Sequence, residues 1–169
     1  MDLDYAKSAK KINGMCSVCI TPEDLRKEVK EGGSDKYIYK PYEDFRFGLG
    51  TALKQSCESV GFYENKQDAL KQKSSIIIVP RVATESKGGF WTWPPYDFTF
   101  TLDADVYDGA GELAQHIHSS GHSSAGLDEW KKGQGYAGSK AMEQVLKDLL
   151  EKLEYNKFMA GTQAPGKAE

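Results

Sequence analysis

Three histidines lie close together in the chain, at spacings that suit a metal ion. His116 and His118 are separated by one residue, and His122 follows four residues later. Zinc or copper accepts two imidazoles on one face of a strand. Leu113 and Ile117 would lie on the opposite face, so an exposed polar surface explains the same spacing. A metal- or small-ligand-binding site on the His116/His118 face is therefore an alternative hypothesis.

Acidic residues precede these histidines and allow two further kinds of chemistry. A calcium loop would need a ligand where Tyr107 stands, and Asp108-Gly109 comes one residue late for it. Asp103 and Asp105 would lie about 7 Å apart on one strand face, a separation that glycosidases use for acid and base. Exposed strands often carry such pairs, and no Gly-x-Ser-x-Gly motif frames a serine. A hydrolase is the weakest alternative.

The three cysteines, Cys16, Cys19 and Cys57, leave several redox states open. A Cys-x-x-Cys redox pair normally begins a helix, where the thiol pKa is lowered. Cys16 and Cys19 instead lie in an apolar segment before any helix start. One disulfide with a spare thiol and three free thiols both fit this count.

An aromatic segment is the strongest candidate for binding a partner. Phe90, Trp91, Trp93 and Tyr96 surround the prolines of a short stretch. Prolines restrict the chain, and Trp and Tyr are favoured anchors at interfaces. We expect these four residues to contact a protein partner, a glycan or a membrane interface, although they would also fit as a cap on the core.

A β-hairpin must position the acidic residues and the histidines. Apolar and polar residues alternate over 98–107, which predicts a half-buried strand. Asp108-Gly109 is typical of a hairpin turn, and a second run over 112–119 returns. We therefore predict an antiparallel hairpin over residues 96–120.

The remaining elements complete an α+β domain. Helical spacing predicts helices over about 41–60, ending at Gly61, and over about 138–155. A β-branched run over 74–83 predicts a buried strand, and Pro80 within it indicates an edge or a strand end. The expected fold is an antiparallel sheet of about three to five strands packed on one side by the two main helices.

Shorter features set the expected boundaries. A strand is expected over 12–20, and Thr21 and Pro22 are typical of a helix start. Residues 120–135 are expected to form a loop. The predicted organisation is a flexible arm (1–11), a single α+β domain (12–157) and a disordered tail (158–169).

Composition excludes some classes of protein. The net charge of −3 and the pI of about 5.7 argue against a nucleic-acid-binding protein. No apolar run reaches the roughly 18–20 residues of a membrane span, and no signal peptide follows Met1. No motif implies a cofactor.

Three pieces of the sequence together resemble small bacterial envelope lipoproteins. They are the strand Phe98–Tyr107 with its turn, the lead Gly133-Gln134-Gly135-Tyr136-Ala137-Gly138, and the helix Ser139–Leu153. Over roughly 74–154 the chain is similar to the group of LptE-like, YajG-like and ABC-transport-auxiliary lipoproteins. The resemblance implies a non-catalytic accessory or assembly subunit in the periplasm, tethered to the outer membrane by a lipidated cysteine.

The sequence departs from that group because no lipobox precedes Cys16 or Cys19. We therefore expect the native signal peptide, and any lipid anchor, to lie outside this sequence. The leading hypothesis is a cell-envelope protein without enzymatic activity that binds a protein partner through its aromatic segment, either alone or as a homo-oligomer.

Overall fold

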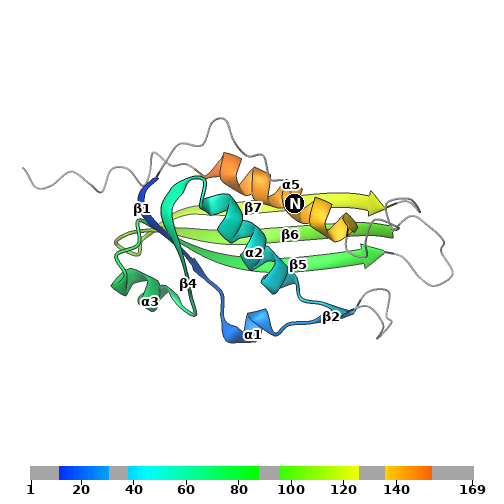
Figure 1. The fold of residues 1–169 in the computed structure, drawn as a ribbon, viewed down its shortest axis with the longest axis horizontal. Coiled ribbons are helices and arrows are strands. Elements are labelled where there is room, and N and C mark those ends of the chain that lie inside the picture. Colours follow the sequence, from blue (N-terminus) through cyan, green and yellow to red (C-terminus); the bar gives the residue numbers. More distant parts are fainter. Residues whose placement is uncertain (1–11, 31–37, 88–95, 126–135, 154–169) are drawn as a thin grey trace, which may run out of the picture.

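The computed structural model describes residues 12–30, 38–87, 96–125 and 136–153. Its helices and strands form a sheet covered by helices (Figure 1). In chain order they are β1 (Ile12–Cys19), α1 (Pro22–Leu25), β2 (Val29–Lys30), β3 (Ile38–Tyr39), α2 (Pro41–Leu53), β4 (Cys57–Tyr63), α3 (Lys66–Lys71), β5 (Ile76–Lys87), β6 (Tyr96–Asp108), β7 (Leu113–Ala125) and α5 (Tyr136–Lys152).

The main sheet is mixed, so the prediction of an antiparallel sheet was wrong. Its strand order is β4-β1-β5-β6-β7, and β2 and β3 form a separate two-stranded sheet. β1 pairs in parallel with both β4 and β5, whereas β5, β6 and β7 pair antiparallel. Helix-containing connections join β1 to β4 and β4 to β5, and such crossovers allow neighbouring strands to run parallel.

The predicted helix over 41–60 was too long, because its last part is a strand. α2 ends at Leu53, and residues 57–63 form β4 at the edge of the sheet. Val60 fits a helical repeat with the apolar residues before it, but it also alternates with Phe62 along β4, and both pack against the core. Gly61 therefore lies within a strand and does not terminate a helix.

The predicted hairpin is confirmed and extends further than expected. β6 and β7 pair from Tyr96↔Ala125 to Tyr107↔Leu113. At the turn, Asp108 Oδ1 accepts hydrogen bonds from the backbone N–H groups of Ala110 and Glu112, both at 2.9 Å. The loop expected over 120–135 was wrong for 120–125, which continue β7.

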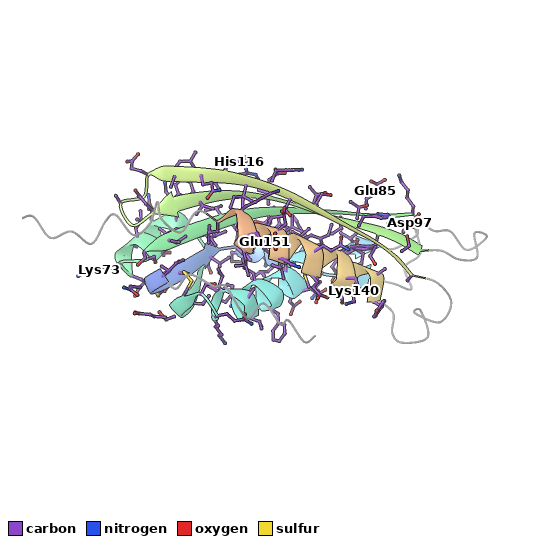
Figure 2. All side chains as sticks on the ribbon, turned by 90° about the horizontal axis from the view of Figure 1, so that it is seen from above. Lys73, Glu85, Asp97, His116, Lys140 and Glu151 are labelled. Atoms are coloured by element: carbon purple, nitrogen blue, oxygen red, sulfur yellow. A yellow bond between two sulfur atoms is a disulfide. The ribbon has the colours of Figure 1, made fainter. Side chains whose placement is uncertain are left out.

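Helices cover both faces of the sheet to different extents. α2 and α5 pack on one face, called here the inner face, where most of the core lies. α3 packs on the other, outer face against Cys19 and Ile77. Seen from above, the strands form one layer and α5 lies beneath it, with His116 on the side away from the helix (Figure 2). The long outer face of β5, β6 and β7 is left to polar side chains.

Pro80 lies in a part of β5 that no longer pairs with β1, which fits the edge or strand end that the sequence predicted there. β1 pairs with β5 only from Ile76 to Ile78. The Val82 N–H points away from β6, since it donates to Tyr42 Oη at 3.0 Å. Alternate residues of a strand direct their N–H groups to the same side. The missing N–H of Pro80 therefore costs no hydrogen bond to β6.

The predicted start of α1 is also confirmed. Thr21 is the N-cap, with Pro22 at the first helical position. Thr21 Oγ1 accepts a hydrogen bond from the Asp24 N–H at 3.1 Å, which satisfies one of the free donors of the helix end.

Candidate functional site

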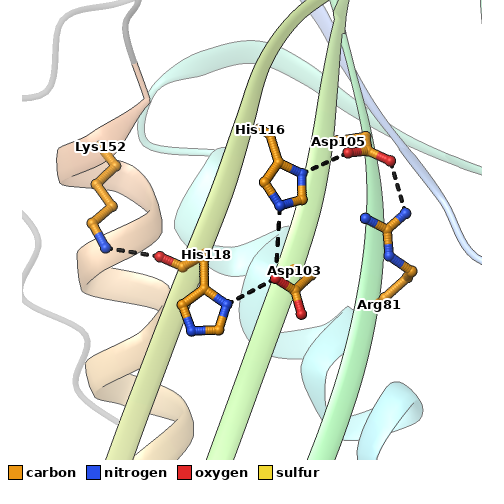
Figure 3. Close-up of polar contacts among 6 residues, drawn as sticks. All are labelled: Arg81, Asp103, Asp105, His116, His118 and Lys152. Atoms are coloured by element: carbon orange, nitrogen blue, oxygen red, sulfur yellow. Dashed lines mark hydrogen bonds and ion pairs between the residues drawn. The ribbon is translucent and has the colours of Figure 1, made fainter.

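Polar side chains from three strands meet on the outer face of the sheet, as Figure 3 shows. Strand alternation directs Asp103 and Asp105 to this face of β6, and directs His116 and His118 to the same face of β7. The register places Asp103 opposite His118 and Asp105 opposite His116. The structure therefore brings together two histidines and two carboxylates that the sequence had suggested separately.

Asp105 is the centre of this cluster. Its two carboxylate oxygens receive hydrogen bonds from different strands, one from Arg81 Nη1 on β5 and one from His116 Nδ1 on β7, each at 2.7 Å. These two bonds hold the pKa of Asp105 below its usual range. The carboxylate in turn raises the pKa of Arg81. A carboxyl group with a lowered pKa stays ionised at neutral pH, so Asp105 accepts protons poorly and is unsuited to act as a general acid.

Asp103 links the two histidines. Its Oδ1 lies 2.8 Å from His118 Nδ1 and 3.7 Å from His116 Nε2. His116 therefore faces a carboxylate at each ring nitrogen. The side chains of both histidines are more than half exposed, at 51% and 62%. The cluster is an ordered but open surface.

Helix α5 adds a contact from the edge of the sheet. Lys152 Nζ donates to the backbone carbonyl of His118 at 2.8 Å, and the Gln144 side chain accepts from the His122 N–H at 3.0 Å. These two bonds satisfy backbone groups on the free edge of β7. They also fix the strand that carries the histidines.

The third histidine lies apart from the first two. His122 Nδ1 is 3.3 Å from Thr99 Oγ1, and its Nε2 is 3.9 Å from Asp97. Among the described residues, no group of three His, Cys, Asp or Glu side chains is placed to hold a metal ion. A metal on the His116/His118 face stays a prediction.

The cysteines divide between the two faces of the sheet. Cys16 forms a disulfide with Cys57, which joins β1 to β4 with Cα atoms 6.0 Å apart. Cys19 is a buried thiol that packs under α3, because residues three apart on a strand point to opposite faces. Burial, assisted by the nearby charge of Asp68, raises the pKa of Cys19 to about 11. The thiol is therefore protonated at neutral pH and is a poor nucleophile.

The predicted partner-binding segment lies largely outside the described residues. Phe90, Trp91 and Trp93 fall in the range 88–95, and the structure describes only the backbone of Tyr96, as the first residue of β6. The chain ends of this segment are nevertheless placed. Lys87 and Asp97 are paired at the end of β5 and β6, so the segment joins the two strands at one end of the sheet.

Sequence reasoning missed Arg81, the cation that binds Asp105. Within β5 it is the first exposed residue after a buried run, which was a local signal for a polar face. Its partner could not be identified without the register between β5 and β6, which places Arg81 opposite Asp103 and diagonal to Asp105.

Comparison with known proteins gives a general likeness of fold. No protein-family model matches this sequence, and no curated protein matches it at a significant level. A PelC dodecamer from Paraburkholderia phytofirmans is 14% identical, with a TM-score of 0.47 over 85% of this chain and 93% of that chain. A minor lipoprotein from Acinetobacter baumannii is 10% identical, with a TM-score of 0.44 over 89% and 93%. The similar structures thus include a lipoprotein, but at these values they do not decide the function of the chain.

No helix in the described part of the chain has the length and apolar character needed to cross a membrane.

Proposed function

We propose that this chain is a binding or assembly module of the cell envelope, without enzymatic activity, that works outside the cytoplasm. The observation that supports this proposal is the disulfide between Cys16 and Cys57. Disulfides persist in oxidising compartments, whereas cytosolic thiols are kept reduced. Both cysteines are buried in the main core, so the bridge belongs to the folded state of the domain.

The proposed partner contact is the aromatic segment with Phe90, Trp91, Trp93 and Tyr96. Its two chain ends lie at one end of the long strands β5 and β6 (Figure 1). These strands are held in place because β5 pairs with β6 and β6 pairs with β7. A rigid sheet that presents a short, proline-containing segment reduces the entropy lost on binding. This placement supports a protein partner for the segment.

Thiol trapping in cells tests the compartment. Cells that express the natural reading frame are quenched in acid, denatured and treated with a maleimide that adds mass to each free thiol. We expect one modified cysteine, Cys19, and two more only after reduction. Three modified thiols before reduction would contradict an oxidising compartment.

A paired substitution tests the partner contact. Trp91→Ala with Trp93→Ala should abolish partner capture from an envelope extract while the circular dichroism spectrum stays unchanged. Phe47→Ala is the matched control, because Phe47 is an aromatic side chain that is 76% exposed on α2 and does not belong to this segment. Equal capture by the double variant and the control would show that the segment is not the contact.

A further inference from the structure

In the parallel part of the sheet, the chain connections that follow the neighbouring strands β1 and β4 lie on opposite faces. After β1 the chain passes through α2, which packs on the inner face, before it forms β4. After β4 it passes through α3, which packs on the outer face, before it forms β5. Neighbouring strands with connections on opposite faces leave a crevice outside their carboxyl ends, and ligands bind in such crevices.

A groove of about 470 Å³ lies at this point. This volume is within the range of small-ligand sites. Figure 1 shows α1 and α3 following the ends of β1 and β4. The groove is lined by Ile20, Pro22 and Leu25 after β1, by Phe62, Tyr63, Glu64 and Asp68 around the end of β4, and by Arg46 on α2.

The apolar wall of the groove is built around Phe62. A side chain on Gly50 would meet this ring at 2.9 Å, so the glycine allows Phe62 to lie against α2. The guanidinium of Arg46 lies 4.7 Å from the ring centroid, in a cation–π contact. Within the described ranges, no carboxylate lies within ion-pair distance of Arg46. As far as the described residues go, its hydrogen-bond donors are therefore available to an anion at the Phe62 wall of the groove.

Carboxylates line another part of the groove. Asp68 accepts hydrogen bonds from Asn65 at 2.9 Å and from Lys71 at 2.7 Å, and these bonds lower its pKa. Glu64 is exposed and, among the described side chains, has no cationic partner. Lys71 balances the charge of Asp68. An anionic amphiphile would gain from Arg46 but would be repelled by Glu64, whose charge no described cation balances. A ligand with charges of both signs is complementary to the groove.

We propose that this groove binds a short peptide segment of a partner protein, in which an apolar side chain lies between an acidic and a basic residue. The apolar side chain packs on Phe62, the acidic residue binds Arg46, and the basic residue binds Glu64. This site involves no residue of the aromatic segment, so its failure would leave the proposed function intact.

Titration of the whole chain with blocked tripeptides, followed by ¹H–¹⁵N NMR, tests the groove. The probes are acetyl-Asp-Leu-Lys-amide and acetyl-Lys-Leu-Asp-amide, compared with acetyl-Ser-Leu-Ser-amide and with decanoate. We expect one charged peptide to shift the amides of Ile20, Leu25 and Phe62, and to bind roughly tenfold more tightly than the serine peptide. Arg46→Gln should remove that advantage. Lys54→Gln, an exposed cation at the end of the same helix, should keep it.

Three results would overturn the proposal. One is that no peptide shifts these amides. Another is that decanoate causes the same shifts with equal or higher affinity, which would indicate an anionic amphiphile as the ligand. The third is that Arg46→Gln and Lys54→Gln bind the charged peptide equally, with unchanged melting temperatures for both variants.

Discussion

At the scale of single residues, the outer-face cluster shows how neighbours determine what a carboxyl group can do. Asp103 and Asp105 have the spacing of a catalytic pair, but their carboxylate oxygens are hydrogen-bonded to side chains from the adjacent strands. Hydrogen bonds to the charged form favour ionisation. Asp105 therefore acts as a link between β5, β6 and β7.

Removing the Arg81 side chain should raise the pKa of Asp105. The hydrogen bond from Arg81 is the largest cause of the lowered value. A lowered folded-state pKa stabilises the protein above the unfolded value of about 3.9, and that contribution is lost as the pH falls through the folded-state value. Carbon-13 NMR titration of the Asp105 carboxyl group should show a higher midpoint in Arg81→Ala.

The same variant should lower the free energy of unfolding at pH 7 by only about 0.5–1 kcal/mol, because the Arg81 side chain is 56% exposed. This difference should shrink as the pH falls below about 4. Lys87→Ala, at the end of the same strand, removes a more exposed ion pair with Glu85 and serves as the control. An unchanged Asp105 midpoint in Arg81→Ala would refute the assigned cause.

At the scale of elements, the packing of α5 on the sheet depends on one glycine. A side chain on Gly121 would collide with the backbone carbonyl of Ala141, and a backbone atom cannot move aside as a side chain can. The close approach also brings Gln144 to the His122 N–H. Gly121 therefore sets the distance between β7 and α5.

Gly121→Ala should destabilise the protein by about 2–3 kcal/mol, the cost of overpacking a tight contact. Gly138→Ala is the matched control on α5, since its added carbon would lie 3.5 Å from the Phe98 ring, an ordinary contact. Alanine is also favoured over glycine within a helix. Urea denaturation should separate the two variants. Equal stability of both would mean that α5 moves away from β7 at little cost.

Elements with local signals could be predicted from the sequence. The hairpin carries strict alternation and its own turn residues, and α5 carries a clear apolar stripe. β4 could not be predicted, because the apolar residues before Val60 continue a helical repeat into it. Its parallel partner, β1, lies 41 residues away at the disulfide, and no local pattern encodes such a pairing.

The candidate site was predictable to the same limited extent. Alternation placed Asp103, Asp105, His116 and His118 on one face, which the structure shows. The contacts that determine their chemistry depend on the register of three strands, and Arg81 enters only through that register. The groove beyond the ends of β1 and β4 depends on parallel pairing, so it could not be inferred from local spacing.

At the scale of the whole molecule, the sheet combines two kinds of strand pairing. β4 and β1 form a parallel unit that pairs with β5 over three residues, whereas β5, β6 and β7 pair antiparallel over almost their whole lengths. Fewer backbone pairs therefore hold the parallel unit, with β4 at its edge, than hold the antiparallel strands together. The Cys16–Cys57 bridge lies in this unit.

Removing the bridge should therefore reduce the stability of the whole domain. Closing a loop of 41 residues is expected to contribute about 3–4 kcal/mol, chiefly by restricting the unfolded chain. Cys16→Ala with Cys57→Ala should unfold at lower urea concentration than the natural chain by this amount. A reductant should shift the natural chain and the variant Cys19→Ala, but it should leave the double variant unchanged, since that variant has no bridge to reduce. If the reductant shifts neither the natural chain nor Cys19→Ala, the disulfide does not stabilise the fold, and the edge strand β4 is held by its pairing with β1 alone.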